Sequence, residues 1–142
     1  MQWNDKTNAG FSTAAPWLPV PPSYKTHNVD SESRDPNSIL NFYKKLLAMR
    51  HTNPALLDGD YVAVNTNDSN VYSYLRRYKG QAVLVVLNMS TAPQKVSFDL
   101  SQQGFNTREA KTLLTTTKAG ATQALSGIAL DPYAVYIGEV SK

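Results

Sequence analysis

The sequence is 142 residues long, 42% hydrophobic and 18% charged, a composition typical of one folded globular domain rather than a disordered segment. Its formal net charge is +3, from 14 basic and 11 acidic residues that are mostly scattered, so we expect no nucleic-acid partner. The absence of cysteine excludes disulfides, thiolate chemistry and cysteine-ligated zinc. This is compatible with a reducing compartment, and we favour a cytoplasmic location.

Residues 1–35 are rich in Asn, Ser, Thr and Pro, yet they carry the large aromatic residues Trp3, Phe11, Trp17 and Tyr24. Because flexible linkers rarely hold such rings, we expect a long irregular segment that packs against a neighbour. Trp3, Trp17 and Tyr24 are also the candidates for substrate binding, because exposed aromatic rings can stack on sugars. We favour packing over stacking for the two tryptophans.

The next segment predicts one amphipathic helix over about residues 36–51. Asp35 suits its N-cap, Pro36 suits its first position, and Pro54 ends it by restricting Asn53. One face of this helix carries Ile39, Tyr43, Leu46 and Arg50.

From residue 56 onward the apolar residues recur with the period of two that is typical of strands. We expect strands near residues 61–64, 71–75, 82–87, 96–100, 110–114, 128–130 and 133–137. The longest apolar run, 82–87, has the length of a strand, far short of the roughly 20 residues that span a bilayer, so no membrane partner is expected. Neither does the polar N-terminus have the apolar stretch of a signal peptide. The predicted fold class is mainly β, an antiparallel Greek-key sandwich of seven or eight strands preceded by a long loop and one helix.

Few residues of this sequence suit catalysis or metal binding. His27 and His51 are the only histidines, and neither has a second ligand nearby. Asp30, Glu32 and Asp35 are the only acidic cluster, and helix capping explains them better than the paired carboxyl groups of glycoside hydrolysis. The sequence has no nucleotide-binding or nucleophile-elbow motif. We therefore predict no catalytic residue, no metal site and no cofactor.

Several ordered motifs resemble one known family. The runs MQWNDKTNAGFS, APWLPVPPSY, HNVDSESRDPNSILNFYKKLLAMRHTNPAL and LDGDY are similar to the segment that closes the catalytic barrel of α-amylase-superfamily glycoside hydrolases, glycoside hydrolase family 13. Within that family they are most similar to the α-glucosidase and oligo-1,6-glucosidase group, which includes the sucrose isomerases. The runs VYSYLRRYKGQAVLVVLNMS and LDPYAVYIGEV are similar to the group's C-terminal β-domain. One departure is Asn4, where the family commonly has Asp, which questions a charge-dependent role there.

This resemblance implies two parts. Residues 1–55 would be the terminal loop and last helix of a truncated (β/α)8 barrel, and 56–142 the C-terminal β-sandwich. The parent enzyme would be an α-glucosidase that hydrolyses O-glycosyl bonds of α-linked gluco-oligosaccharides. Its catalytic carboxylates and its sugar-binding arginine lie on earlier segments, so this chain alone should be inactive and structural. Its partner would be the upstream catalytic barrel, and Met1 is either a start codon or a truncation point.

Two alternatives belong to other classes. The chain could be a stand-alone carbohydrate-binding sandwich that stacks an oligosaccharide on Trp3, Trp17, Tyr72 or Tyr74. It could instead be an interaction module that self-associates through the exposed face of the predicted helix.

Overall fold

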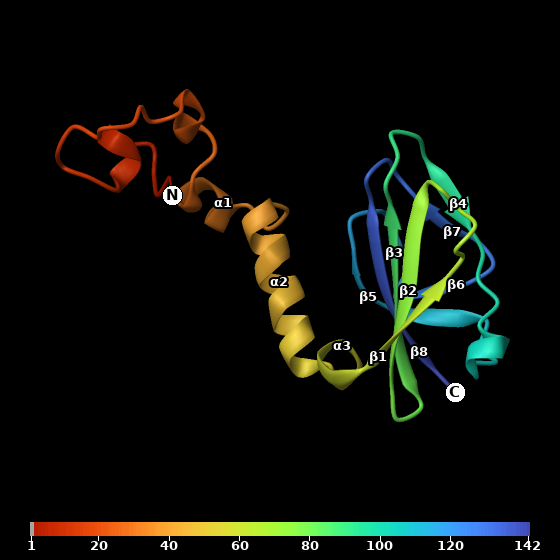
Figure 1. Cartoon of the computed structure of the whole chain (residues 1–142). Coiled ribbons are helices and arrows are strands. Elements are labelled where there is room, and N and C mark those ends of the chain that lie inside the picture. Colours follow the sequence, from red (N-terminus) through yellow and green to blue (C-terminus); the bar gives the residue numbers. More distant parts are fainter. Residues whose placement is uncertain (1) are drawn as a thin grey trace. The chain divides into compact units, whose positions relative to one another are not determined.

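The computed structural model describes residues 2–142, so Met1, the first residue of the MQW motif, lies outside the described residues. The chain folds into two compact units, the first ending at Met49 and the second running from Arg50 to Lys142. Figure 1 follows both units from the N-terminal end to the C-terminal end. Within residues 2–142, no helix combines the length and the apolar composition that crossing a membrane requires.

The first unit has more local structure than an irregular loop. It contains two 3-10 helices, Thr7–Gly10 and Pro22–Lys25, followed by helix α1, Val29–Arg34, and by the start of helix α2, Ile39–Thr52. The N–H groups of Val29 and Asp30 donate to the carbonyl oxygens of Gln2 and Trp3, both at 3.0 Å. These bonds tie Gln2 and Trp3 to the first turn of α1.

The predicted start of the main helix is wrong by three residues. Helix α2 begins at Ile39, whereas Asp35 is the C-cap of α1 and accepts a hydrogen bond from the N–H of Asn37 at 2.9 Å. The hydroxyl of Ser38 accepts from the N–H of Asn41 at 3.1 Å, so Ser38 takes the capping role that was expected of Asp35. The end of α2 at Thr52, before Pro54, is as predicted.

The second unit contains a short helix, eight strands and a 3-10 helix at Ser101–Gln103. The elements are α3 (Pro54–Asp58), β1 (Asp60–Val64), β2 (Val71–Tyr78), β3 (Gln81–Asn88), β4 (Gln94–Val96), β5 (Glu109–Thr115), β6 (Thr122–Ala124), β7 (Ile128–Leu130) and β8 (Val135–Ser141). Six strands form one sheet in the order β1-β2-β3-β8-β5-β6, and β4 pairs with β7 in a second sheet (Figure 1).

Every strand pair in the described chain is antiparallel. The chain leaves the large sheet after β3, returns for β5 and β6, leaves again for β7, and inserts β8 between β3 and β5. This path confirms the predicted antiparallel sandwich. The prediction of one preceding helix is wrong, because α1 and α3 flank α2, and strand β6 was also missed.

The core lies between the two sheets. Its largest fully buried side chains include Leu75, Leu84, Leu130 and Tyr136. The predicted strand over 96–100 is wrong except at Val96, because β4 spans Gln94–Val96, yet Phe98 and Leu100 are still buried at 9% and 2% exposure. The alternation of apolar and polar residues therefore predicts which side chains are buried, even beyond the last hydrogen bonds of the strand.

Strand β3 is buried on both faces. Ala82, Leu84 and Val86 belong to the core between the sheets, whereas Val83 and Val85 face the opposite side at 0% and 5% exposure. We call that opposite side, defined by Tyr61, Tyr72, Tyr74, Arg76, Val83, Val85 and Ile137, the outer sheet face. Helix α3 contacts β2 and β3, and its residues Ala55 and Leu56 are buried.

Candidate functional site

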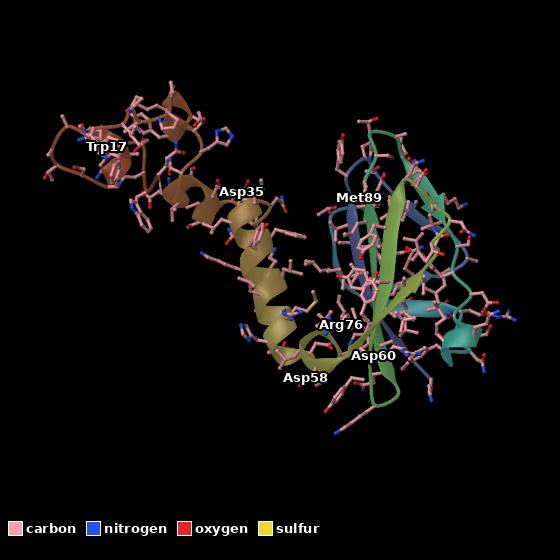
Figure 2. All side chains as sticks on the ribbon, viewed as in Figure 1. Trp17, Asp35, Asp58, Asp60, Arg76 and Met89 are labelled. Carbon is pink, nitrogen blue, oxygen red and sulfur yellow. The ribbon has the colours of Figure 1, made fainter. Side chains whose placement is uncertain are left out.

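The three aromatic candidates of the first unit do not form one stacking platform. Trp17 is 91% exposed (Figure 2), Trp3 is half-exposed, and Tyr24 is half-buried in the second 3-10 helix. The ammonium of Lys25 lies 4.8 Å from the centroid of the Tyr24 ring. The ring-to-ring contacts recorded for residues 2–142 involve other residues, so the structure does not bring Trp3, Trp17 and Tyr24 together.

The acidic cluster has structural roles, as the capping interpretation predicted. Asp30 and Glu32 lie in the first turn of α1, where negative charge is favourable. A carboxylate oxygen of Glu32 accepts from the N–H of Leu40 at 3.1 Å, and Asp35 accepts from Asn37. A hollow of about 140 Å³ beside Glu32 is also lined by His27 and Asn28. It offers a single carboxylate, already hydrogen-bonded, where glycoside hydrolysis needs two.

The side chain of Asn4, the departure from the family pattern, closes a turn. Its amide oxygen accepts from the N–H of Lys6 at 3.0 Å. The same side chain lies over Gly10, where an added Cβ would come within 2.3 Å of it. Asn8, Ala9 and Gly10 all have positive φ angles. This left-handed run is strained at Asn8 and Ala9, and an aspartate at position 4 could accept the same hydrogen bond.

The histidines and carboxylates do not gather into a metal site. Nδ1 of His27 lies 2.8 Å from the hydroxyl of Thr26, and His51 occupies the last turn of α2, where it faces the negative end of the helix dipole. Among residues 2–142 no three His, Asp or Glu side chains lie close enough to share a metal ion.

The structure does bring three tyrosines together on the outer sheet face. The rings of Tyr61 and Tyr74 have centroids 5.2 Å apart, and those of Tyr72 and Tyr74 lie 5.6 Å apart. The hydroxyls of Tyr61 and Tyr72 are 2.9 Å apart, so one donates to the other. Tyr72 and Tyr74 were predicted from the sequence as stacking candidates, but Tyr61 was missed. The sequence of neither strand reveals that β1 pairs with β2 and places Tyr61 beside them.

Hydrogen bonding and burial favour the neutral forms of Tyr61 and Tyr74. The hydrogen bond between Tyr61 and Tyr72 raises the pKa of Tyr61 above its ordinary value of 10.0, and burial raises the pKa of Tyr74. The guanidinium groups of Arg76 and Arg50 partly offset the rise in the pKa of Tyr74. Neutral phenols in a half-exposed layer can pack or stack, but they supply neither the nucleophile nor the general acid of a glycosidase.

Two family models match the chain in succession. Residues 1–59 match the model described as alpha amylase, catalytic domain, and residues 61–137 match the model described as maltogenic amylase, C-terminal domain.

Curated relatives agree with these matches. An oligo-1,6-glucosidase of Parageobacillus thermoglucosidasius is 39% identical over 90 residues, which is 63% of this chain and 16% of the relative. A trehalose-6-phosphate hydrolase of Bacillus subtilis is 29% identical over 148 residues, which is all of this chain and 25% of the relative.

Solved structures give the same result. The trehalulose synthase of Pseudomonas mesoacidophila matches 99% of this chain with 24% of its own, at a TM-score of 0.85 and 33% identity. An isomaltulose synthase of Klebsiella matches with a TM-score of 0.85 at 30% identity, covering 98% of this chain and 24% of its own.

The chain thus spans between about a sixth and a quarter of the length of the relatives it matches. The matched models meet at residues 59–61, where α3 gives way to β1, and the second model covers more than half of the chain. This chain belongs to the α-amylase superfamily of glycoside hydrolases, glycoside hydrolase family 13, and carries the end of a catalytic-domain match followed by a C-terminal β-domain.

Proposed function

We propose that this chain supports the catalytic barrel of an α-glucosidase-like enzyme that acts on α-linked gluco-oligosaccharides, and that it performs no chemistry itself. In this proposal residues 1–55 complete the barrel and residues 56–142 form the supporting sandwich. The observation that carries the proposal is the succession of the two family models along one short chain. The hydrogen-bonded, capping carboxylates of the first unit are in keeping with it.

The exposed side of α2 gives further support. Ile39, Tyr43 and Leu47 follow one another at intervals of four residues and are 73%, 58% and 53% exposed. Side chains at this spacing form one stripe on a helix. Because burying such side chains is worth about 1.5–3 kcal/mol each, the stripe is suited to packing against further parts of a barrel.

The test is an assay of the purified chain on p-nitrophenyl α-glucoside. The expected result is release of nitrophenol at the rate of the buffer blank. A chimera in which this chain replaces the matching quarter of the B. subtilis trehalose-6-phosphate hydrolase should retain hydrolysis of trehalose-6-phosphate. Turnover by the isolated chain, in material free of any full-length glycosidase, would contradict the proposal.

Sugar binding on the tyrosine cluster is the second candidate, because Tyr61 and Tyr72 are each 50% exposed and can stack on a pyranose ring. Maltose or isomaltose added to the isolated chain would then shift its tyrosine and tryptophan fluorescence in a saturable way. An unchanged spectrum up to millimolar sugar would reject this candidate and leave the supporting role in place.

Self-association through the exposed α2 stripe is the third candidate, because an exposed apolar stripe can also pack against a second copy of the chain. Light scattering decides it. A monomer at all concentrations, together with an unaltered elution volume in L47E, would reject self-association.

A further inference from the structure

The second unit has two hollows that meet at one side chain, and their volumes are about 350 Å³ and 250 Å³. Gln103, in the 3-10 helix between β4 and β5, lines both of them. We call the two hollows together the Gln103 cleft. Its polar lining includes Asp60, Arg77 and Lys79 in the larger hollow and Asn65, Thr66 and Asp99 in the smaller one. The larger hollow lies at the lower end of the size range of small-molecule sites.

The side-chain amide of Gln103 has a buried oxygen without a partner. Its Oε1 atom accepts no hydrogen bond from any residue in the range 2–142. A buried acceptor without a donor is rare in native proteins, because its lost hydrogen bonds to water are not replaced. The last torsion of a glutamine is broad, so this amide can turn its oxygen or its NH2 group toward the hollows that it lines. The cleft therefore suits a ligand that supplies a donor to Gln103.

A fixed ion pair lies in the larger hollow. Nε and Nη2 of Arg77 donate at 3.2 Å and 2.7 Å to the two carboxylate oxygens of Asp60, which is labelled in Figure 2. These two bonds leave the guanidinium with further N–H groups and each carboxylate oxygen with a second lone pair. The side chains of Arg77 and Asp60 are 37% and 57% exposed. The pair thus holds donors and acceptors side by side, where a ligand can reach them.

Lys79 occupies a turn position that does not suit a lysine. Tyr78 pairs with Gln81 across a two-residue turn, in which Lys79 and Gly80 have φ angles of 46° and 84°. Positive φ at both residues is the pattern of a type I′ turn, whose first position favours Asn, Asp or Gly. Departures from such local preferences are expected at functional positions. Here the lysine side chain lines the larger hollow, with its ammonium 5.0 Å from the centroid of the Tyr78 ring.

This lining matches a ligand rich in hydroxyl groups. A hydroxyl both donates and accepts, and the cleft offers carboxylate and amide acceptors beside guanidinium and ammonium donors. A simple anion would meet the carboxylates of Asp60 and Asp99, and an apolar ligand would leave the charged groups without partners. Phe105 and Phe98, at 3% and 9% exposure, line one hollow each. Their rings give the apolar face of a pyranose a surface on which to pack.

We propose that the Gln103 cleft binds two adjoining sugar units of an α-linked gluco-oligosaccharide, one in each hollow, with sugar hydroxyls donating to Gln103 and Asp60. Arg77 and Lys79 donate to the sugar oxygens in return. The cleft gives the chain a binding role in addition to its supporting one. The choice of α-linked glucose units rests on the proposed function, whereas the recognition of hydroxyl groups rests on the lining of the cleft.

The Gln103 cleft is separate from the tyrosine cluster. Tyr74 and Arg77 lie three residues apart on β2, so they point to opposite faces of the sheet. None of Tyr61, Tyr72 and Tyr74 lines either hollow. Sugar binding at the cleft and at the tyrosine cluster can therefore be told apart residue by residue.

The first arm of the test follows the backbone amides of the full chain by NMR during titration with maltose and isomaltose. Saturable shifts are expected around Lys79, Gly80 and Gln103. Maltose should bind more tightly than glucose, because glucose fills one hollow only. Shifts confined to Tyr61, Tyr72 and their neighbours would place the sugar on the tyrosine cluster and overturn the inference, as would an unchanged spectrum at millimolar sugar.

The second arm compares two neighbouring glutamines. Gln103→Ala should weaken maltose binding at least about fivefold, the effect of one lost hydrogen bond. It should leave the urea midpoint of unfolding unchanged, because Oε1 has no partner in the chain to lose. Gln102→Ala is the matched control, since Gln102 is exposed in the same 3-10 helix and lines neither hollow. Equal affinities of the two variants for maltose would overturn the inference.

Lys79→Gly separates binding from folding. It should raise the urea midpoint, because glycine adopts a positive φ without strain, and it should weaken maltose binding because an ammonium donor is lost. An unchanged affinity would overturn the inference, since the strained lysine would then have no role in the cleft.

Inorganic phosphate is the probe for an anion site. Maltose binding should persist at high salt, because hydrogen bonds to a neutral sugar are little screened. Shifts of the cleft amides that phosphate causes at lower concentration than maltose, and that high salt abolishes, would identify an anion site and overturn the sugar assignment.

The outcomes separate this inference from the proposed function. A cleft that binds no sugar would overturn the site and leave the supporting role, which needs no sugar contact by this chain. Release of nitrophenol by the isolated chain would contradict the supporting role whether or not the cleft binds maltose.

Discussion

The side-chain amide of Asn88 donates to the carbonyl oxygen of Asp131 at 2.8 Å, across 43 residues of sequence. It also donates to the carbonyl of Ala92 at 2.8 Å, while its oxygen accepts from the N–H and the hydroxyl of Ser90. Asn88 is only 2% exposed, so one buried amide joins the loop after β3 to the turn before β8.

Replacing Asn88 should therefore be among the most harmful polar substitutions in the chain. Asn88→Ala removes the bonds to both carbonyls and leaves the N–H of Ser90 without its acceptor, and we expect a loss of about 2–3 kcal/mol in the free energy of unfolding. Asn88→Asp should fare little better, because it keeps the acceptor and loses both donors. Urea unfolding followed by circular dichroism measures the loss. The control is Asn106→Ala, at an exposed loop position, which should stay within about 0.5 kcal/mol.

Gly59 lies between α3 and β1, where the backbone atoms of neighbouring residues leave no room for a side chain. A Cβ at this position would lie 2.3 Å from the carbonyl oxygen of Ala55 and 2.8 Å from that of Arg77. Because both obstacles are backbone atoms, Gly59→Ala should destabilise the second unit by about 2–3 kcal/mol.

The matched control for Gly59 is Gly104→Ala, where an added Cβ meets nothing within 4 Å but the φ angle is +88°. That strain should amount to about 1 kcal/mol. Equal losses for the two variants would show that the close approach at Gly59 does not matter.

Alkaline pH should weaken the fold through its tyrosines. Burial raises the pKa of Tyr136 above 10.0, and the raised pKa values of Tyr61 and Tyr74 act in the same direction. The folded state then favours the protonated phenols. Their contribution to the free energy of unfolding is complete below the unfolded-state pKa of about 10, and it is lost as the pH rises through their higher folded-state pKa values. Urea midpoints measured from pH 8 to pH 11 should be flat at first and then decline.

Tyr136→Phe separates the contribution of the buried Tyr136 to this alkaline decline from that of the more exposed tyrosines. Tyr136 is 1% exposed, and its hydroxyl reaches the carbonyl of Ala110 only at 3.5 Å. The variant should therefore lose little stability at pH 8 and decline less steeply above pH 10. An alkaline decline as steep as that of the wild type would show that other groups cause it.

Much of this fold can be predicted from the sequence, since apolar residues alternate along the strands. Residues 82–87 predicted a central strand, and β3 is buried on both faces. The helix start failed because two good caps, Asp35 and Ser38, lie three residues apart, and the chain uses Asp35 to end α1. Helix α1 escaped notice because its capping box pairs Asn28 with Ser31 rather than with Glu or Gln.

The candidate site was less predictable. Tyr61, Tyr72 and Arg76 meet through the register of β1 on β2, in which Tyr61 faces Arg76. Register depends on the turn between the strands and on which face is buried, and neither is legible in a single strand.

The N-cap of α3 offers a last test, because this helix rests on the large sheet. The side chain of Asn53 accepts from the N–H groups of Ala55 at 3.0 Å and Leu56 at 3.3 Å. Asn53→Ala should reduce the free energy of unfolding by about 1 kcal/mol. Asn53→Asp keeps the acceptor and adds a negative charge at the positive end of the helix, so it should match or slightly exceed the wild type.

Hydrogen exchange of α3 shows where the loss occurs. Leu56 is 7% exposed and its carbonyl accepts from Arg50 at 2.8 Å, so the end of α2 and the sheet are both tied to this one turn. In Asn53→Ala the amides of residues 55–58 should exchange faster than in the wild type, while those of β3 keep their protection. Faster exchange throughout β3 would mean that α3 is required for the sheet to form, and the cap would then matter for the whole unit.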